Sequence, residues 1–182
     1  PKHCIEMKPG FLGHLYPVID QEKCINCKLC QKGCPSLQYI DCSYPKKAYA
    51  AWAKDAQDYV TSTSGGAASV LSQYIVSLGG VVYGCSVLPN IQISHIRVDK
   101  MEDLHLLKGS KYVQSQIEFI IPQLRNDVKQ GVPVLFVGTP CQVAAIKQLY
   151  GTMPDNLYLV DIICHGTPSN QFLKDYIQRN LK

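Results

Sequence analysis

Residues 24–35 read CINCKLCQKGCP, and this stretch decides how the first quarter of the chain can fold. Four thiols stand at intervals of three, three and four residues, and a proline directly follows the last of them. The run C-x2-C-x2-C-x3-C-P is typical of bacterial ferredoxins, in which a tight turn points three thiolates at one 4Fe–4S cluster while the fourth often serves a second. The spacing therefore predicts iron–sulfur ligands at Cys24, Cys27, Cys30 and Cys34.

Zinc is the alternative metal for such a group of thiols. Structural zinc sites usually draw their ligands from two separated pairs. Four cysteines within eleven residues do not follow that arrangement. An iron–sulfur site is favoured, and a zinc-stabilised interaction module stays as the alternative.

The composition excludes several classes of protein. The chain has 182 residues, 46% of them hydrophobic, and a formal net charge of +4 without any long basic run, so nucleic acid is not an expected partner. No apolar stretch approaches the roughly 20 residues that cross a bilayer, and the first residues lack a signal-peptide core. We therefore expect no membrane span and a cytoplasmic location, where nine cysteines, an odd number, indicate metal ligation and not a paired disulfide framework.

The cysteine density marks a domain boundary. Six of the nine cysteines precede residue 44, in a segment rich in Lys, Gly and Pro without a sustained hydrophobic period. We predict a 4Fe–4S ferredoxin-type domain over residues 1–43 and an α/β domain over residues 44–182. Because the run occurs twice in two-cluster ferredoxins and its first copy also ends in Cys-Pro, the opening PKHC indicates the second half of such a domain, and the chain is expected to be a fragment.

Strand and helix patterns alternate after this boundary. The pattern predicts strands at 48–52, 81–84, 93–98, 132–138 and 157–164, and helices at 67–78, within 109–131, at 141–151 and at 169–182. Such alternation is typical of an α/β domain with a mainly parallel or mixed sheet and flanking helices.

Two later cysteines share one sequence context. In FVGTPCQVAAI a hydrophobic strand delivers Cys141 to a helix start, and in LVDIICHGTPS a second strand delivers Cys164 to a turn. Open α/β sheets place ligands and cofactors at the carboxyl ends of their strands. Each cysteine alone is more typical of a core residue, but the matching contexts make them candidate metal ligands.

Two segments have the composition of a phosphate site. The small residues of TSTSGG precede a helix, where backbone N–H groups can approach a phosphate, although an ordinary serine N-cap explains the same pattern. GSKYVQS, residues 109–115, adds hydroxyls, a lysine and an aromatic ring. His95 is interpreted either as a proton donor beside a cofactor or as a satisfied structural histidine. No catalytic residue is identified.

These motifs together resemble one family. The ferredoxin run, STSGGAASVLSQYIVSLGGVVYG, HIRVDKMEDLHLLKGSKYVQSQI, VLFVGTPCQVAAI and DIICHGTPS are similar to the coenzyme F420 hydrogenase/dehydrogenase beta-subunit family. More narrowly, they resemble the bacterial members with an N-terminal ferredoxin domain, often encoded among polysaccharide-synthesis genes. The resemblance implies an oxidoreductase in which electrons pass between 4Fe–4S clusters, FAD and a small-molecule substrate or a redox partner protein.

The resemblance also implies particular site residues. Family members build a cluster near the flavin from cysteines matching Cys141 and Cys164 and from a later Cys-x-x-Cys pair, which has no counterpart before Lys182. FAD contacts are expected at Ser62, Ser64, Gly65, Gly66, Ser110, Lys111, Tyr112 and Ser115. The use of coenzyme F420 itself is left open, because bacteria with polysaccharide-linked relatives need not make it. A non-catalytic electron carrier or accessory subunit is the second interpretation.

Overall fold

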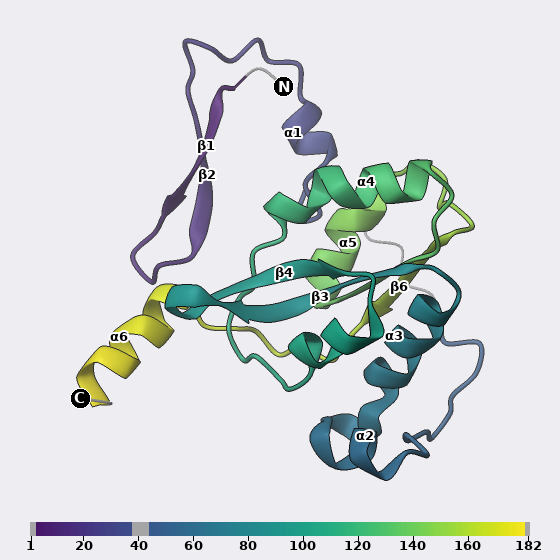
Figure 1. Ribbon diagram of the computed structural model, residues 1–182. Coiled ribbons are helices and arrows are strands. Elements are labelled where there is room, and N and C mark those ends of the chain that lie inside the picture. Colours follow the sequence, from purple (N-terminus) through teal and green to yellow (C-terminus); the bar gives the residue numbers. More distant parts are fainter. Residues whose placement is uncertain (1–2, 38–43, 181–182) are drawn as a thin grey trace.

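The computed structural model describes residues 3–37 and 44–180. Among these residues, four strands form one mixed sheet in the order β4-β3-β5-β6 (Figure 1). β5 pairs in parallel with both β3 and β6, whereas β4 pairs with β3 in the antiparallel direction. The strands are β3 (Val81–Leu88), β4 (Gln92–Val98), β5 (Val134–Gly138) and β6 (Leu157–Asp161). The prediction of an α/β domain with a mainly parallel or mixed sheet is confirmed.

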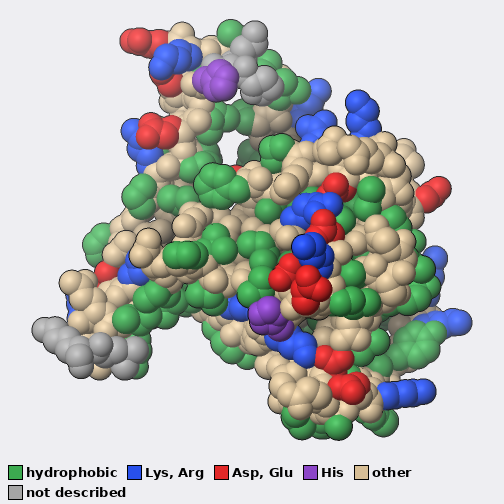
Figure 2. Space-filling model, viewed as in Figure 1, with side chains coloured by type: hydrophobic (Ala, Val, Ile, Leu, Met, Phe, Trp, Pro, Cys, Tyr) green, Lys and Arg blue, Asp and Glu red, His purple; other side chains and the backbone are tan. Residues whose placement is uncertain are grey.

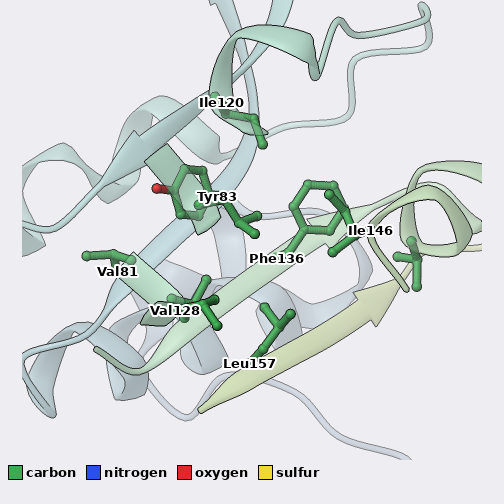
Figure 3. Packing of buried hydrophobic residues seen from close by; sticks show 10 residues of the cluster. Val81, Tyr83, Ile120, Val128, Phe136, Ile146 and Leu157 are labelled. Atoms are coloured by element: carbon green, nitrogen blue, oxygen red, sulfur yellow. The ribbon is translucent and has the colours of Figure 1, made fainter. Parts of the chain in front are cut away.

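Helices cover both faces of this sheet. Because side chains alternate along a strand, Tyr83 and Phe136 point to one face, while their neighbours Val82 and Leu135 point to the other. The first face packs against α4 (Ile121–Lys129) and α5 (Pro140–Gln148), as Figure 3 shows for part of this cluster. The second face packs against α3 (Ala67–Ser77) and the 3-10 turn η3 (Met101–Leu107). The sheet is therefore the middle layer of three.

The remaining elements are short or peripheral. α6 (Asn170–Asn180) follows β6 and has no buried residue among those described. The others are α1 (Leu29–Lys32), α2 (Ala56–Thr61) and the 3-10 turns η1 (Ser64–Gly66), η2 (Pro89–Ile91) and η4 (Glu118–Ile120). The predicted strands from residue 81 onward and the predicted helices match elements of the structure, with bounds that differ by a few residues.

A β-hairpin precedes the ferredoxin run, and the sequence pattern did not predict it. β1 (Ile5–Pro9) and β2 (Leu15–Ile19) pair in antiparallel register, with Pro9 opposite Leu15. Every residue of β1 is exposed, and only Leu15 of β2 is partly buried. Figures 1 and 2 show the hairpin standing apart from the layers around the sheet. The predicted boundary at 43/44 borders residues 38–43, which lie outside the described part of the chain.

The predicted strand at 48–52 is wrong. The segment is irregular, and Tyr49 and Trp52 are largely exposed. Alanine has low strand propensity, and three of the five residues are alanine, so only packing against a sheet could make the segment a strand. It packs instead against the turn before α3, where the Ala53 N–H donates to the Gly65 carbonyl at 2.7 Å.

A buried ion pair ties α4 to the sheet. The Arg97 Nε donates to Asp127 Oδ2 at 2.8 Å, and the Tyr83 hydroxyl donates to the same oxygen at 2.6 Å. Burial raises the pKa of Tyr83, and its bond to Asp127 adds to the rise, so the hydroxyl keeps its proton. Arg97 also bonds Asp99, which lies in solvent.

Asp127→Ala is expected to lower the free energy of unfolding by about 2–3 kcal/mol, because the buried Tyr83 hydroxyl and the Arg97 Nε lose their acceptor while Asp99 still pairs with Arg97. Asp99→Ala is the matched control: it removes another carboxylate from the same Arg97, but the Asp99 side chain is 49% exposed against 8% for Asp127. The control should cost about 1 kcal/mol or less. Urea unfolding measures both, and equal losses would contradict the assignment of the buried pair.

Candidate cofactor-binding sites

The four cysteines of the ferredoxin run lie on an irregular segment that leads into α1. Cys27 and Cys30 are exposed, while Cys24 and Cys34 are partly exposed. Between the first three cysteines, Asn26 and Lys28 adopt left-handed φ angles of 53° and 59°. Left-handed residues curl the backbone sharply and can turn successive N–H groups toward one concave side, a feature of many Fe–S sites. The backbone thus already bends between the thiols.

The side chains of this run do not converge as they stand. Within residues 3–37 and 44–180, no three His, Cys, Asp or Glu side chains form a group that could hold a metal ion. Preformed metal sites are rare where metal binding and local folding are linked, since the ligands gather only around the metal. The donor set, four free and accessible thiols on a curled segment, nevertheless fits a 4Fe–4S cluster in its chemistry.

The two later cysteines lie where the strand pattern predicted them. Gly138 and Asp161 are register partners at the carboxyl ends of β5 and β6, and Cys141 and Cys164 each follow three residues later. Cys141 is exposed in the first turn of α5, with its Sγ 3.2 Å from Thr139 Oγ1. Cys164 is partly exposed and accepts a bond from the Gly166 N–H at 3.4 Å. Both thiols therefore follow neighbouring strands at one edge of the sheet.

The two predicted phosphate segments meet. Ser110 Oγ donates to Thr63 Oγ1 at 3.3 Å, although 47 residues separate them in the chain. Ser64 and Tyr112 are exposed. The Ser62 hydroxyl oxygen is buried without a hydrogen-bond partner, which is unusual for a buried polar atom.

The glycines of the first segment serve packing. Gly65 and Gly66 have φ angles of 69° and 79°, a region open mainly to glycine. A Cβ on Gly66 would lie 3.1 Å from that of Ala53, and one on Gly65 would lie 3.2 Å from that of Trp52. The serine N-cap considered for this helix is absent among the described contacts, because Gly66 itself stands at the N-cap of α3 without a side-chain bond.

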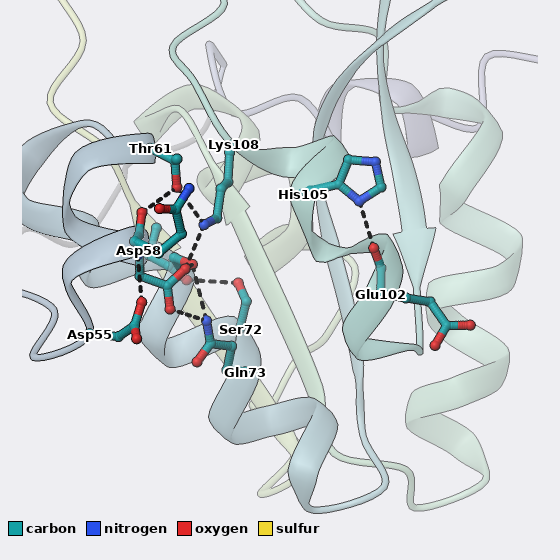
Figure 4. A network of polar contacts seen from close by, with 11 residues as sticks. Asp55, Asp58, Thr61, Ser72, Gln73, Glu102, His105 and Lys108 are labelled. Atoms are coloured by element: carbon teal, nitrogen blue, oxygen red, sulfur yellow. Dashed lines mark hydrogen bonds and ion pairs between the residues drawn. The ribbon is translucent and has the colours of Figure 1, made fainter.

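A polar network holds the two segments together (Figure 4). The Lys108 ammonium donates to Asp58 on α2 and, at 2.9 Å, to Thr61 Oγ1. Asp58 also accepts bonds from Ser69 and Gln73 of α3. The Lys108 contact, with Gln73 second, holds the pKa of Asp58 below its usual range. Asp58 therefore stays ionised and links the turn before α3 to the segment that begins after Lys108.

The Lys111 ammonium is hydrogen-bonded within the protein. The Lys111 ammonium is half-buried and donates to the carbonyls of Leu107 and Lys108 at 3.0 and 2.8 Å. Burial lowers its pKa, with the Cys85 thiol offsetting part of the change, and burial raises the pKa of Cys85. Lys111 is thus close to the half-buried Cys85 thiol.

His95 is a satisfied structural histidine. Its Nε2 lies 2.9 Å from the Val137 carbonyl, which only accepts, so Nε2 carries the proton and Nδ1 accepts from Ser115 Oγ at 3.0 Å. Gln142 Nε2 in turn donates to Ser115 Oγ at 2.9 Å. Burial lowers the pKa of His95, which keeps the ring neutral, and the ring stacks on Phe136. The Ser115 proton is therefore committed to His95.

Sequence reasoning missed three residues of these sites. Asp58 and Lys108 form the link described above, and Gln142 connects Ser115 to the start of α5. Lys108 stands directly before GSKYVQS, and Gln142 stands three residues after Thr139, a capping-box spacing, so both had a local signal. Asp58 had none, because its partners lie on other elements.

Comparison with known families decides the class of the chain. Residues 15–36 match the model of a 4Fe–4S binding domain, and residues 132–182 match the model for the C terminus of the coenzyme F420 hydrogenase/dehydrogenase beta subunit. These two matches support the resemblance to the F420 hydrogenase/dehydrogenase beta-subunit-like family. The first match contains Cys24, Cys27, Cys30 and Cys34, and the second spans the elements from β5 to α6 with Cys141 and Cys164. Together, the 4Fe–4S match and the beta-subunit match support an iron–sulfur electron-transfer protein.

A solved structure shares the fold of this chain. A chain from the F420-reducing [NiFe] hydrogenase complex of Methanosarcina barkeri superimposes with a TM-score of 0.58 at 20% sequence identity. The match covers 70% of this chain and 47% of that chain, so the present sequence corresponds to about half of it. No curated protein matches the chain significantly. In the part of the chain that the structure describes, no helix is both long and apolar enough to cross a lipid bilayer.

Asp58→Asn is expected to lower the free energy of unfolding by about 1–2 kcal/mol near neutral pH, because the bond to the Lys108 ammonium loses its charge. The folded-state pKa of Asp58 lies below the reference value of 3.8, so the wild-type advantage is full above that pH and is lost as the pH falls through the folded pKa. Urea unfolding from pH 7 to pH 2 measures it. Asp155→Asn, at an exposed position, is the control. A gap between wild type and Asp58→Asn that does not narrow in acid would contradict the ion pair.

Proposed function

We propose that this protein is an iron–sulfur flavoprotein oxidoreductase that passes electrons between 4Fe–4S clusters and FAD, and from there to a small-molecule substrate or a redox partner protein. Residues 1–43 form the ferredoxin-type domain in this proposal, and residues 44–182 the flavin-binding α/β domain. The carrying observation is the four-thiol run inside the residues that match a 4Fe–4S binding domain.

Cluster ligation follows from the donor set. Cys24, Cys27 and Cys30 are assigned to one cluster, and Cys34, which follows α1, is free to serve another. Cys141 and Cys164 contribute ligands to a further cluster at the strand ends. A 4Fe–4S cluster supplies one-electron transfer when it is bound. The protein's part is to set the ligand geometry and the exposure of each cluster to solvent.

FAD contacts are assigned to the two segments that meet at Thr63 and Ser110. In this proposal the exposed Ser64 and Ser110 hydroxyls bond phosphate oxygens, Ser62 lies at the base of the same turn, and the exposed Tyr112 ring offers a stacking surface. FAD supplies the exchange between single electrons and electron pairs, with two protons taken up for each pair. Lys111 contributes positive charge to this region, while its ammonium holds the segment by two carbonyl bonds.

The chain's own residues also limit proton movement. Neutral His95 holds the Ser115 proton, and its own proton is bonded to the Val137 carbonyl. No step is therefore assigned to His95 as an acid. Its role is to fix the segment that ends at Ser115 against β5.

A second candidate function is an accessory electron-transfer subunit without a substrate of its own. The solved chain that shares this fold comes from a hydrogenase complex, which favours a partner protein as the electron donor or acceptor. Flavin binding separates the two functions, because an electron carrier needs only the clusters.

The test is anaerobic purification followed by a visible spectrum and by iron, sulfide and flavin analysis. Iron with equimolar sulfide, together with bound FAD, supports the oxidoreductase. Clusters without FAD support the accessory subunit. A colourless protein, or one that holds zinc, contradicts the proposal and leaves the zinc-stabilised module.

Cys24→Ser is expected to remove one cluster, or about four iron and four sulfide per chain, because it leaves only two of the three thiols of the run that are assigned to that cluster. Cys85→Ser is the matched control, since Cys85 is a half-buried thiol within β3 and is assigned to no cluster. Cys141→Ser should leave the clusters of the ferredoxin run intact. Equal iron loss in the Cys24 and Cys85 variants would refute the ligand assignment.

Tyr112→Ala is expected to weaken FAD binding about 3- to 10-fold, the effect of losing one aromatic stacking contact. Tyr49→Ala is the control, because both rings are 80% exposed in the free protein and only Tyr112 lies in the proposed site. Titration of the deflavinated protein with FAD, followed by fluorescence quenching, gives both dissociation constants. An unchanged constant for Tyr112→Ala would remove this ring from the site.

A further inference from the structure

The tip of the β1–β2 hairpin lies against two distant segments of the α/β domain. His14 Nδ1 is 2.8 Å from Gln114 Oε1, and the backbone N–H of Gln114 donates to the Pro168 carbonyl at 2.9 Å. Ser169 Oγ donates to the Leu12 carbonyl at 2.5 Å. Residues 12–14, 114 and 168–169 therefore form one contact region, which we call the hairpin joint.

Ser169 stands at the centre of the hairpin joint. It is only 2% exposed, and its hydroxyl both donates to the hairpin and accepts from the Phe172 N–H at 3.2 Å, which caps the start of α6. Gly13, with φ +78°, touches the same place: a Cβ there would lie 2.7 Å from Gln171 Cβ and 2.8 Å from Ser169 Oγ. The contact is thus close enough to require glycine at the hairpin tip.

The hairpin joint connects directly to the candidate cofactor sites. Gln114 is followed by Ser115, whose hydroxyl and carbonyl accept bonds from Gln142 Nε2 at 2.9 and 3.0 Å. The Gln142 Oε1 accepts from the Thr139 N–H, and the Thr139 hydroxyl lies against the Cys141 thiol. On the other side, Pro168 and Ser169 end the segment that begins at Cys164. A series of contacts therefore runs from the hairpin tip to Cys141, and Cys164 is joined to the hairpin joint by the short segment of chain that ends at Ser169.

The hairpin has little else to hold it. Its strands bury no residue fully, and an isolated pair of strands is marginally stable in water at best. The ferredoxin run follows β2 by a few residues, so the orientation of the hairpin helps to determine where that run lies.

We propose that the hairpin joint fixes the ferredoxin-type domain at a set separation from the strand-end cysteines, with Gly13, Gln114 and Ser169 as positioning residues. The role in electron transfer rests on the proposed function, because electron transfer slows steeply as the gap between centres grows. The claim that the joint holds the hairpin in place rests on the contacts alone. The two parts can therefore fail separately.

The first test compares Gly13→Ala with Gly131→Ala in the full chain. Both glycines have left-handed backbones, with φ of +78° and +76°, but a Cβ on Gly131 would meet no atom within 4 Å. Hydrogen exchange of the β1 and β2 amides is the readout, with and without reconstituted clusters. Gly13→Ala should accelerate hairpin exchange at least about tenfold, and Gly131→Ala should leave it unchanged. Both variants carry the same backbone strain, so a difference between them reports the steric clash at Gly13. Equal exchange in the two variants overturns the joint.

The second test is a double-mutant cycle of His14→Ala and Gln114→Ala. Each single change should accelerate hairpin exchange about fivefold, the usual effect of one hydrogen bond, and the double variant should add little, because the two side chains bond each other. Additive effects overturn the pairing. His105→Ala, which loses a histidine bonded to the Glu102 carbonyl far along the chain, is the control.

The consequence for electron transfer has its own readout. In cluster-loaded protein, Gln114→Ala should weaken the magnetic interaction between reduced centres in the EPR spectrum, while iron content stays at the wild-type value. Loss of iron in Gln114→Ala would overturn a positioning role, since the residue would then support the cluster itself. If wild-type protein binds no cluster, the proposed function fails, and the exchange measurements still decide whether the joint exists.

Discussion

The burial of β5 on both faces is the constraint on which the rest of the structure depends. Val134, Leu135 and Phe136 are almost wholly removed from solvent and alternate between the two apolar clusters. A strand in this position must have neighbours on both edges and helices on both faces. Those requirements bring β3 and β6 alongside, and they carry the chain after each parallel strand to the same edge of the sheet, where Cys141 and Cys164 follow.

The hydrophobic pattern was enough to predict this layered part. Runs such as VPVLFVG are short, apolar and bounded by Gly and Pro, so tertiary packing agrees with local preference. The sequence-based prediction failed where tertiary packing alone determined the local structure. The alanine-rich segment at 48–52 has no strand preference and no sheet neighbour. The apolar side chains of the β1–β2 hairpin, such as Ile5 opposite Ile19, are exposed, so burial in a core does not explain the hairpin. Its sequence signal was the turn with Gly10 and Gly13 between two short runs.

The sequence predicted the places of the two later cysteines better than the contacts around them. The strand pattern put Cys141 and Cys164 after the carboxyl ends of neighbouring strands, where the structure has them, and the ligand roles of the thiols stay predictions. Long-range hydrogen bonds were beyond the sequence, because Lys108 reaches Asp58 across 50 residues and Gln142 reaches Ser115 across 27. Such contacts redirect side chains that composition alone assigns to a ligand. Ser115 is the example, because its hydroxyl is bonded to His95 and to Gln142.

The exposure of the ferredoxin run affects both the assembly of a cluster and the oxidation of its thiols. Cys27 and Cys30 are open to solvent on a segment without a core of its own. Thiols in that position can be reached by whatever delivers iron and sulfide, so assembly needs no unfolding of the α/β domain. The same openness admits oxidants, and accessible thiolates proceed to sulfenic acid and to unintended disulfides. Metal binding and thiol oxidation therefore compete at the ferredoxin run, and anaerobic conditions favour metal binding.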